Sequence, residues 1–334
     1  MENLEFYQAG NVTLQSGEVL KGAQLAWQSF GTLNAARDNA VVLFSYYGGT
    51  HRHYHSLIGP GRVLDPERWF IVLLNLFGNG VSTSPSNSPL QPGSNFPKVT
   101  LIDNINVQYR LLIDELGIQR IALAAGWSMG AMQAWHWAAS WPERVKNMLA
   151  VCGSARCWPL NQVFLHGVKA ALLTDPAFQQ GDYLQPPAQG LAAFGRVYAG
   201  WAYSARFYRE EGYRELGFDT LEEFLQFWEA DHQQADANDL LAMLHAWQMA
   251  DIGLLPGCQG SSEMALRRIE ARTIVMPCDT DQYFTLEESR LECQFLQRGI
   301  LRPLYSRNGH CAGAPGRFSA ETAQIEDAMA ALLA

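Results

Sequence analysis

The stretch Ile121-Ala-Leu-Ala-Ala-Gly-Trp-Ser-Met-Gly-Ala-Met-Gln-Ala-Trp-His-Trp-Ala-Ala139 predicts the fold more specifically than any other part of this chain. Its first five residues form an apolar run typical of a strand, and its last nine are typical of a helix. Gly126-Trp-Ser-Met-Gly130 joins the two runs and matches the pattern G-x-S-x-G in a strand-turn-helix setting. Glycines allow so tight a turn, which presents Ser128 at the end of the strand, next to a helix N-terminus. We interpret Ser128 as a nucleophile, although a glycine-flanked serine also occurs by chance.

Apolar strand-like runs alternate with amphipathic helical runs on both sides of this stretch, which predicts a mostly parallel sheet covered by helices. One helix is expected between about residues 102 and 116, with Thr100 and Asp103 as its capping box and Gly117 as its stop. A second is expected over 286–297, and a last helix has Ile325 on its apolar face. Strands are expected at 41–44, 70–74, 121–125, 148–151 and 273–276, with a short one near 301.

The alternation stops after Cys157, and about a hundred residues rich in Trp, Tyr and Phe are predicted to be helical. We therefore predict an α/β-hydrolase fold whose core comprises residues 1–156 and 263–334, with an inserted helical cap over 157–262. Internal repeats and low-complexity tracts are not found in the sequence.

The composition of the chain indicates which kinds of molecule the protein binds. The formal net charge is −9 and basic residues do not cluster, which argues against nucleic acid or an anionic membrane surface. The first five residues carry two acids and no apolar run, so we expect no secretory signal. No apolar stretch reaches the roughly 20 residues that span a bilayer. The charge thus favours a small-molecule partner. The six cysteines form no C-x-x-C pair, which predicts reduced thiols and a cytoplasmic location.

A serine nucleophile needs a base and an orienting acid, which follow it in this fold in the order acid, then histidine. Of eight histidines only His310 lies beyond residue 245, and it occupies a loop before the last predicted helix. The acid is expected after the strand at 273–276, where Asp279 and Asp281 both qualify. Spacing does not decide between them, and the other would be a turn-forming aspartate.

A tetrahedral intermediate also needs backbone N–H donors. Met129 follows the nucleophile and supplies one, and the loop Ser45-Tyr-Tyr-Gly-Gly49 after an early strand is expected to supply the other through Tyr47. Further substrate contacts are expected from Tyr46, Gly48, Trp127, Arg156 and Cys311.

The segment His51-Arg-His-Tyr-His55 has two interpretations. In an extended segment the three histidines would project to one side and invite a metal ion. The sequence offers no matching cluster of Asp or Glu, so we interpret the segment as a polar loop and expect neither a metal nor a cofactor.

Taken together, several motifs resemble the homoserine O-acetyltransferase-like branch of the α/β-hydrolase superfamily. The resemblance spans most of the core and rests on Phe30-Gly-Thr-Leu-Asn34, Leu57-Ile-Gly-Pro-Gly61, Asn75 to Gly80, Phe96-Pro-Lys-Val-Thr100, Gly126 to Gln133 and Gly153-Ser-Ala-Arg156. It implies a helical lid over a tunnel to the serine, a ping-pong acyl-enzyme mechanism and often a homodimer formed through the lids. The family's acid lies in a D-x-x-F turn, which matches Asp281-Gln-Tyr-Phe284 and favours Asp281.

This sequence also departs from the family. Members that acetylate homoserine follow the catalytic histidine with an aspartate that holds the ammonium group, whereas Cys311 stands here. Lys169 lies near the place of a carboxylate-binding arginine. Because a thiol cannot replace a carboxylate as partner of an ammonium, homoserine is disfavoured as the acceptor, and the chain is expected not to be a true homoserine acetyltransferase.

Three hypotheses follow. The first is a serine acyl hydrolase that acts on a small acyl ester through an acyl-enzyme. The second is an O-acyltransferase that moves an acyl group from acyl-CoA, as co-substrate, to homoserine or another hydroxyl acceptor. The third is a non-catalytic ligand-binding protein on the same fold, because a fold does not determine function.

Overall fold

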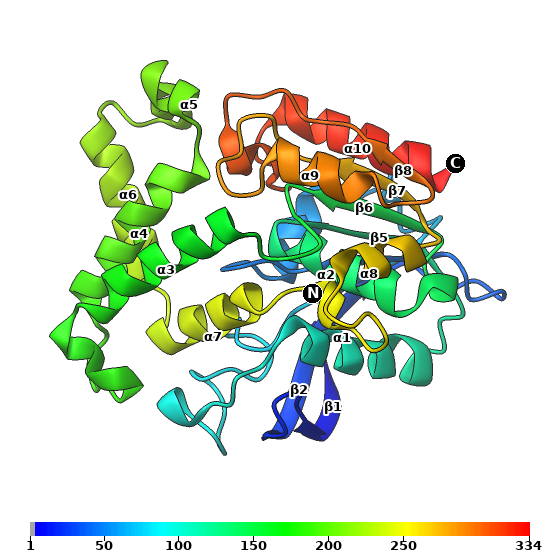
Figure 1. Cartoon of the computed structure of the whole chain (residues 1–334), viewed down its shortest axis with the longest axis horizontal. Coiled ribbons are helices and arrows are strands. Elements are labelled where there is room, and N and C mark those ends of the chain that lie inside the picture. Colours follow the sequence, from blue (N-terminus) through cyan, green and yellow to red (C-terminus); the bar gives the residue numbers. More distant parts are fainter. Residues whose placement is uncertain (1–3) are drawn as a thin grey trace.

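The computed structural model describes residues 4–334, and in this part of the chain eight strands form one sheet with the order β1-β2-β4-β3-β5-β6-β7-β8 (Figure 1). The strands from β3 to β8 pair in parallel, as predicted, whereas β2 pairs antiparallel with both β1 and β4. The expected strands are confirmed to within a few residues. The strand bounds are β1 (Leu4–Thr13), β2 (Val19–Phe30), β3 (Ala40–Phe44), β4 (Phe70–Leu74), β5 (Ile121–Trp127), β6 (Asn147–Val151), β7 (Arg272–Met276) and β8 (Gly299–Leu301).

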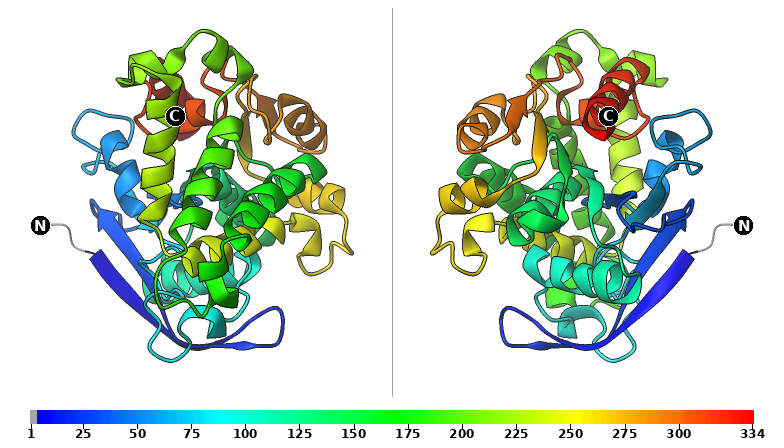
Figure 2. Two further views of the ribbon diagram at one scale, coloured as in Figure 1. Left: turned by 90° about the vertical axis from the view of Figure 1, so that its left-hand side faces the viewer. Right: turned by 90° about the vertical axis from the view of Figure 1, so that its right-hand side faces the viewer.

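The sequence did not predict the hairpin of β1 and β2, which lies at one edge of the molecule (Figure 2). Its register shifts between Gln8 and Gly10 and again between Gly10 and Val12. Each shift breaks the alternation of apolar and polar residues by which a strand is predicted.

Helices cover both faces of the sheet. The Thr100 capping box is confirmed, because the Thr100 hydroxyl accepts from the Asp103 N–H and the Asp103 carboxylate accepts from the Thr100 N–H. The predicted helix divides into α1 and a π-helical segment, η3, which ends before Gly117 (φ +68°). The helix expected to reach residue 297 ends at Cys293. The bounds are α1 (Leu101–Tyr109), η3 (Arg110–Glu115), α2 (Met129–Ser140), α8 (Ser262–Arg268), α9 (Leu286–Cys293) and α10 (Ser319–Leu333).

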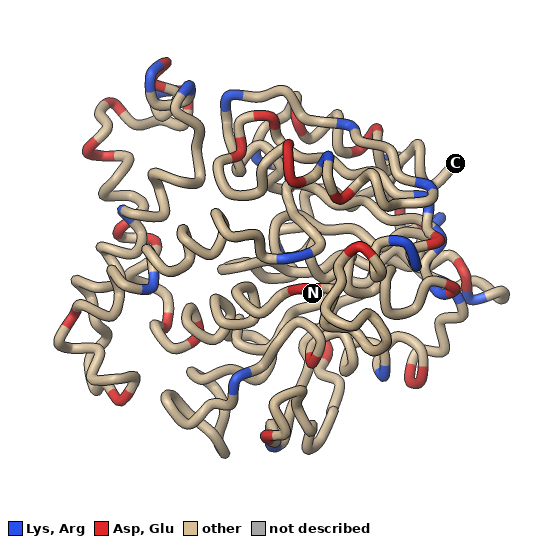
Figure 3. The backbone as a smooth tube through the Cα atoms, in the orientation of Figure 1, with Lys and Arg blue, Asp and Glu red and all other residues tan. Residues whose placement is uncertain are grey.

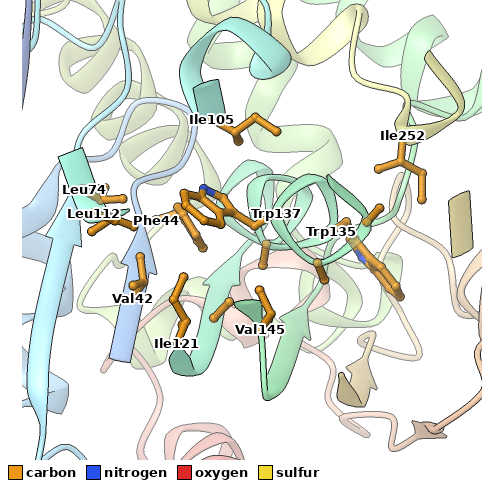
Figure 4. Close-up of a cluster of buried hydrophobic side chains, with 14 of the residues drawn as sticks. Val42, Phe44, Leu74, Ile105, Leu112, Ile121, Trp135, Trp137, Val145 and Ile252 are labelled. Atoms are coloured by element: carbon orange, nitrogen blue, oxygen red, sulfur yellow. The ribbon is translucent and has the colours of Figure 1, made fainter. Parts of the chain in front are cut away.

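The core lies in two layers because successive residues of a strand point to opposite faces. On one face Val42, Phe44 and Leu74 pack with Ile105 of α1 and Trp137 of α2 (Figure 4). On the other face, the alternate strand residues pack with α10 and with the 3₁₀ helix η1 (His51–Leu57).

The segment between β6 and β7 contains the helices α3 to α7, within the range for which a cap was predicted. These helices lie to one side of the sheet (Figures 1 and 2), and α4 packs against α3 and α6. They share an aromatic core that includes Phe164, Phe194, Tyr203, Phe224 and Trp247. The division into a core and a cap as separate domains stays a prediction. The bounds are α3 (Pro159–Leu173), α4 (Ala188–Ala202), α5 (Ala205–Arg209), α6 (Leu221–Gln233) and α7 (Ala237–Gln248).

The remaining short helices are 3₁₀ segments in the connections, and η5 is kinked at Gln179 and Gln180. Their bounds are η2 (Gly93–Asn95), η4 (Pro142–Arg144), η5 (Pro176–Gly181), η6 (Gly212–Leu216), η7 (Ile252–Leu254) and η8 (Gly309–Gly313).

A buried acid, Glu292 of α9, anchors the loop through which the chain leaves β6 and enters α3. Its carboxyl oxygens accept from the Ala155 N–H at 3.1 Å, and Oε1 accepts from the Trp158 indole N–H at 2.8 Å. Burial raises the pKa of Glu292 to about 8. The side chain is therefore largely neutral at pH 7.

Glu292 should make stability fall as pH rises. Between its ordinary pKa of 4.5 and about 8, the folded protein keeps a proton that the unfolded chain has released. The free energy of unfolding then falls by up to about 1.4 kcal/mol per pH unit. We expect the stability of the wild type relative to Glu292→Gln to decrease between pH 5 and 8, measured by urea unfolding. A pH-independent difference would contradict this.

No helix among residues 4–334 has the length and apolar character needed to cross a membrane. Acidic and basic residues are interspersed along the described chain rather than gathered into regions of one sign (Figure 3).

Candidate active site

Ser128 occupies the sharp turn between β5 and α2, with φ 59° and ψ −129°. The neighbouring glycines are sterically required. A Cβ on Gly126 would lie 2.3 Å from the carbonyl carbon of Gly130, and a Cβ on Gly130 would lie 2.3 Å from the carbonyl oxygen of Phe44. The strained backbone at Ser128 is of the kind that accumulates at functional sites.

The structure brings Ser128, His310 and Asp281 together. The Ser128 Oγ lies 2.8 Å from His310 Nε2, and His310 Nδ1 lies 2.7 Å from Asp281 Oδ2. The other carboxylate oxygen of Asp281 accepts from the backbone N–H groups of Tyr283 and Phe284, at 3.1 and 3.0 Å. A carboxylate can only accept, so Nδ1 carries the proton and Nε2 faces the serine hydroxyl as an acceptor. All three side chains are buried.

Asp279, the other candidate for the acid, is bonded to a different part of the protein. Its Oδ1 accepts from the backbone N–H of Ser306 at 2.9 Å. Asp279 thus ties the loop after β7 to the loop that leads to His310, while Asp281 contacts the imidazole itself.

The loops that carry Asp281 and His310 form hydrogen bonds with the end of α4 and with the turn after it. The Gln282 side-chain amide donates to the carbonyl oxygens of Tyr203 (2.5 Å) and Gly200 (3.1 Å). The Ser204 hydroxyl donates to the carbonyl oxygen of Arg307 at 2.5 Å. Both loops that carry the acid and the histidine are therefore joined to the helical insertion.

The two N–H groups predicted to form an oxyanion site are available. Within the described residues, neither the Tyr47 N–H nor the Met129 N–H donates a hydrogen bond. Met129 is the first residue of α2, where the helix itself leaves an N–H without an acceptor. The Tyr47 side chain is buried, and its hydroxyl donates to the carbonyl oxygen of Leu240 in α7.

A cavity of about 370 Å³ opens onto the serine, within the usual range for small-molecule sites. Four of the five predicted further contacts, Tyr46, Gly48, Trp127 and Cys311, line it. Arg156 is not among its lining residues. It forms an ion pair with Asp251 and lies over the ring of Trp158.

Sequence reasoning expected aromatic residues of the insertion in the pocket but did not say which. The cavity walls beyond the predicted residues include Tyr198, Trp228, Asp231, His232, Tyr283 and Arg317. Tyr283 could have been predicted from the sequence, because it lies inside the D-x-x-F turn. The others come from α4, α6 and the loop just before α10, whose approach to Ser128 depends on tertiary packing.

Most of the cavity wall is uncharged. Burial raises the pKa of the Tyr198 and Tyr283 phenols and lowers that of His232, so these groups are neutral at pH 7. Burial also raises the pKa of the Cys311 thiol, with the nearby Arg317 acting in the opposite direction. A neutral thiol offers no partner for an ammonium group.

The histidine-rich segment is the 3₁₀ helix η1, not an extended strand, so its histidines do not project to one side in alternation. Among residues 4–334, no three His, Cys, Asp or Glu side chains converge in a way that would hold a metal ion.

Comparisons with known proteins identify the family to which the chain belongs. The family model of the alpha/beta hydrolase fold matches residues 39–311. The ethyl acetate hydrolase of Pseudomonas veronii is 35% identical over 335 residues, covering 99% of this chain and 94% of the relative. A homoserine O-acetyltransferase of Zymomonas mobilis is 31% identical over 322 residues, covering 84% and 83%.

A solved structure, that of the acetyl esterase MekB, superimposes with a TM-score of 0.95 and 34% identity, covering 99% of this chain and 96% of that one. The resemblance to the homoserine O-acetyltransferase-like branch is thereby confirmed, with esterases among the similar proteins. The chain is an enzyme that belongs to the alpha/beta hydrolase fold family.

Proposed function

We propose that the protein is a serine esterase that hydrolyses small acyl esters through an acyl-enzyme intermediate. The observation that carries the proposal is the buried chain of hydrogen bonds from Ser128 through His310 to Asp281 at the cavity. The similarity to esterases over nearly the whole chain supports it.

In the first half-reaction, His310 Nε2 takes the proton of the Ser128 hydroxyl while Oγ bonds to the ester carbonyl carbon. Negative charge on the carbonyl oxygen is stabilised by the N–H groups of Tyr47 and Met129. The intermediate collapses, the carbon–oxygen bond to the alcohol breaks, and the imidazolium returns its proton to the leaving alkoxide. The products are the alcohol and an ester of Ser128.

In the second half-reaction, water attacks the acyl carbon while His310 takes one of its protons. Collapse releases the carboxylic acid and restores the Ser128 hydroxyl. Asp281 holds the imidazole in the required tautomer and stabilises its cation throughout. These steps need no metal or organic cofactor.

An O-acyltransferase would share the first half-reaction and use an alcohol in place of water. The similarity to homoserine O-acetyltransferases favours it as the second candidate. Against homoserine as acceptor stands Cys311, a buried thiol that follows His310 at the position where the family resemblance implies an aspartate in members that acetylate homoserine. A homodimer through the cap and a cytoplasmic location stay predictions.

Pre-steady-state kinetics with p-nitrophenyl acetate tests the proposal. We expect steady release of p-nitrophenol in water, without any added acceptor, and a rate unchanged within about twofold by millimolar homoserine. A cavity of about 370 Å³ should also favour acetyl over decanoyl esters in kcat/KM.

Two outcomes would contradict the esterase. A burst that stalls until an alcohol arrives would indicate a transferase, and acetyl-CoA with that alcohol should then release CoA. No turnover and no burst from folded protein would argue against the catalytic assignment itself.

A further inference from the structure

The proposed oxyanion site joins two separate parts of the chain. The Tyr47 N–H belongs to the loop after β3, and the Met129 N–H belongs to the first turn of α2. Two donors stabilise one oxyanion only if their separation is held to within about half an ångström. Some contact between the loop and the helix must therefore set that separation.

Gln133 makes such a contact. It lies on α2 one turn after Met129, and its Nε2 donates to the carbonyl oxygen of Ser45 at 2.7 Å. Ser45 is two residues before Tyr47, and its own N–H donates to the carbonyl oxygen of Leu74 at 2.9 Å. The peptide units around Ser45 are thus bonded to β4 on one side and to α2 on the other.

Gln133 is in turn the last member of a buried chain of side chains. The Trp137 indole N–H donates to Gln108 Oε1 at 2.8 Å, and Gln108 Nε2 donates to Gln133 Oε1 at 2.8 Å. Trp137 stands in the core between α1 and α2 (Figure 4), and all three side chains have no exposed surface.

Only one assignment of donors and acceptors fits the hydrogen-bonded series from Trp137 through Gln108 and Gln133 to Ser45. An indole N–H can only donate, so the oxygen of Gln108 must face Trp137 and its amide nitrogen must face Gln133. A carbonyl can only accept, so the amide nitrogen of Gln133 must face Ser45. Hydrogen bonds that all run in one direction strengthen one another. The Ser45 carbonyl itself thus fixes which end of the Gln133 amide faces it, and Gln108 bonds the opposite end of that amide.

We propose that Gln133 is a positioning residue for the oxyanion site, holding the loop of Tyr47 at a set distance from the N-terminus of α2. The inference rests on the proposed function. Gln133 is not among the residues that line the cavity, so it acts through Ser45 and not on the substrate. Burying two amides is costly unless every bond is made, and an apolar pair would fill the same space without that requirement.

The variant that tests this is Gln133→Met, which keeps the approximate shape and removes two hydrogen bonds, to Gln108 and to Ser45. Removing an oxyanion donor outright costs about 10²- to 10³-fold in kcat, and misplacing one should cost part of that. We expect kcat for p-nitrophenyl acetate to fall about 10- to 100-fold, with KM changed less than threefold.

Gln108→Met is the matched control. It also removes two buried hydrogen bonds, to Trp137 and to Gln133, but leaves the bond from Gln133 to Ser45. We expect the two variants to lose similar thermal stability, while kcat of Gln108→Met stays within about threefold of the wild type. A small trifluoromethyl ketone, whose adduct with Ser128 places an oxyanion in the site, should bind Gln133→Met more weakly by the same factor as kcat falls.

Equal losses of kcat in the two variants, or a loss of stability without a loss of kcat in Gln133→Met, would overturn the inference. If Gln133→Met does not fold, Gln133→Asn keeps a buried amide but is about 1.5 Å too short to reach Ser45, and the same loss of kcat is expected. An inactive wild type would instead refute the proposed function, and the positioning role with it.

Discussion

Ser128→Ala is expected to lower kcat for p-nitrophenyl acetate by at least about 10⁴-fold and to abolish the burst. Alanine removes the only atom that bonds to the acyl group, so neither the acyl-enzyme nor its hydrolysis is accessible. The rate that persists should come from substrate binding and the N–H groups of Tyr47 and Met129, which act on water attack as well. Burst kinetics on the purified variant measures both quantities.

Ser154→Ala is a suitable control. Ser154 is also a buried serine near the end of the sheet, but its hydroxyl donates to the carbonyl oxygen of Arg156 and is not bonded to His310. Its kcat should remain within a few-fold of the wild type. Substantial activity in Ser128→Ala, or equal losses in the two variants, would remove Ser128 from the mechanism.

Asp281→Asn is expected to lower kcat by about 10⁴-fold at neutral pH. The backbone N–H groups of Tyr283 and Phe284 would hold the asparagine oxygen, because each can only donate. The asparagine NH₂ group would then face His310 Nδ1, which has to accept. The imidazole proton moves to Nε2, so the base can no longer take the proton of Ser128.

Asp279→Asn is the matched control for Asp281→Asn, because Asp279 lies two residues before Asp281 in the sequence. An asparagine oxygen can still accept from the Ser306 N–H, so this variant should keep kcat within a few-fold of the wild type. Rate measurements from pH 6 to 9 on both variants separate the two roles. Equal losses, or a larger loss in Asp279→Asn, would exchange the assignment of the two acids.

The sequence was sufficient where the cause of a structure is local. The turn at Ser128 is predicted by the two glycines between an apolar run and a helical run. A Cβ atom on either glycine would collide with backbone atoms. The start of α1 follows from Thr100 and Asp103, which satisfy each other's backbone N–H groups. The order of nucleophile, acid and histidine in this fold then predicted that His310 lies near the serine, and its Nε2 is 2.8 Å from Ser128 Oγ.

Other features depend on residues far apart in the chain, so no local pattern carries them. The spacing of Asp279 and Asp281 left both open, and the loop geometry that turns one toward His310 and the other toward Ser306 arises only when β7 and β8 pair. The β1–β2 hairpin escaped prediction because its register shifts erase the alternation that marks a strand.

By itself, the sequence determined the fold class and predicted a nucleophile and its base, because backbone sterics and hydrophobic periodicity act over a few residues. Only the tertiary structure decided which acid contacts the imidazole, which residues of the helical insertion line the cavity and which buried amides join α1, α2 and the loop after β3. The hydrogen bonds among those contacts link residues separated by 25 to 88 positions. They form only when packing has set the distances between elements, which a linear sequence does not state.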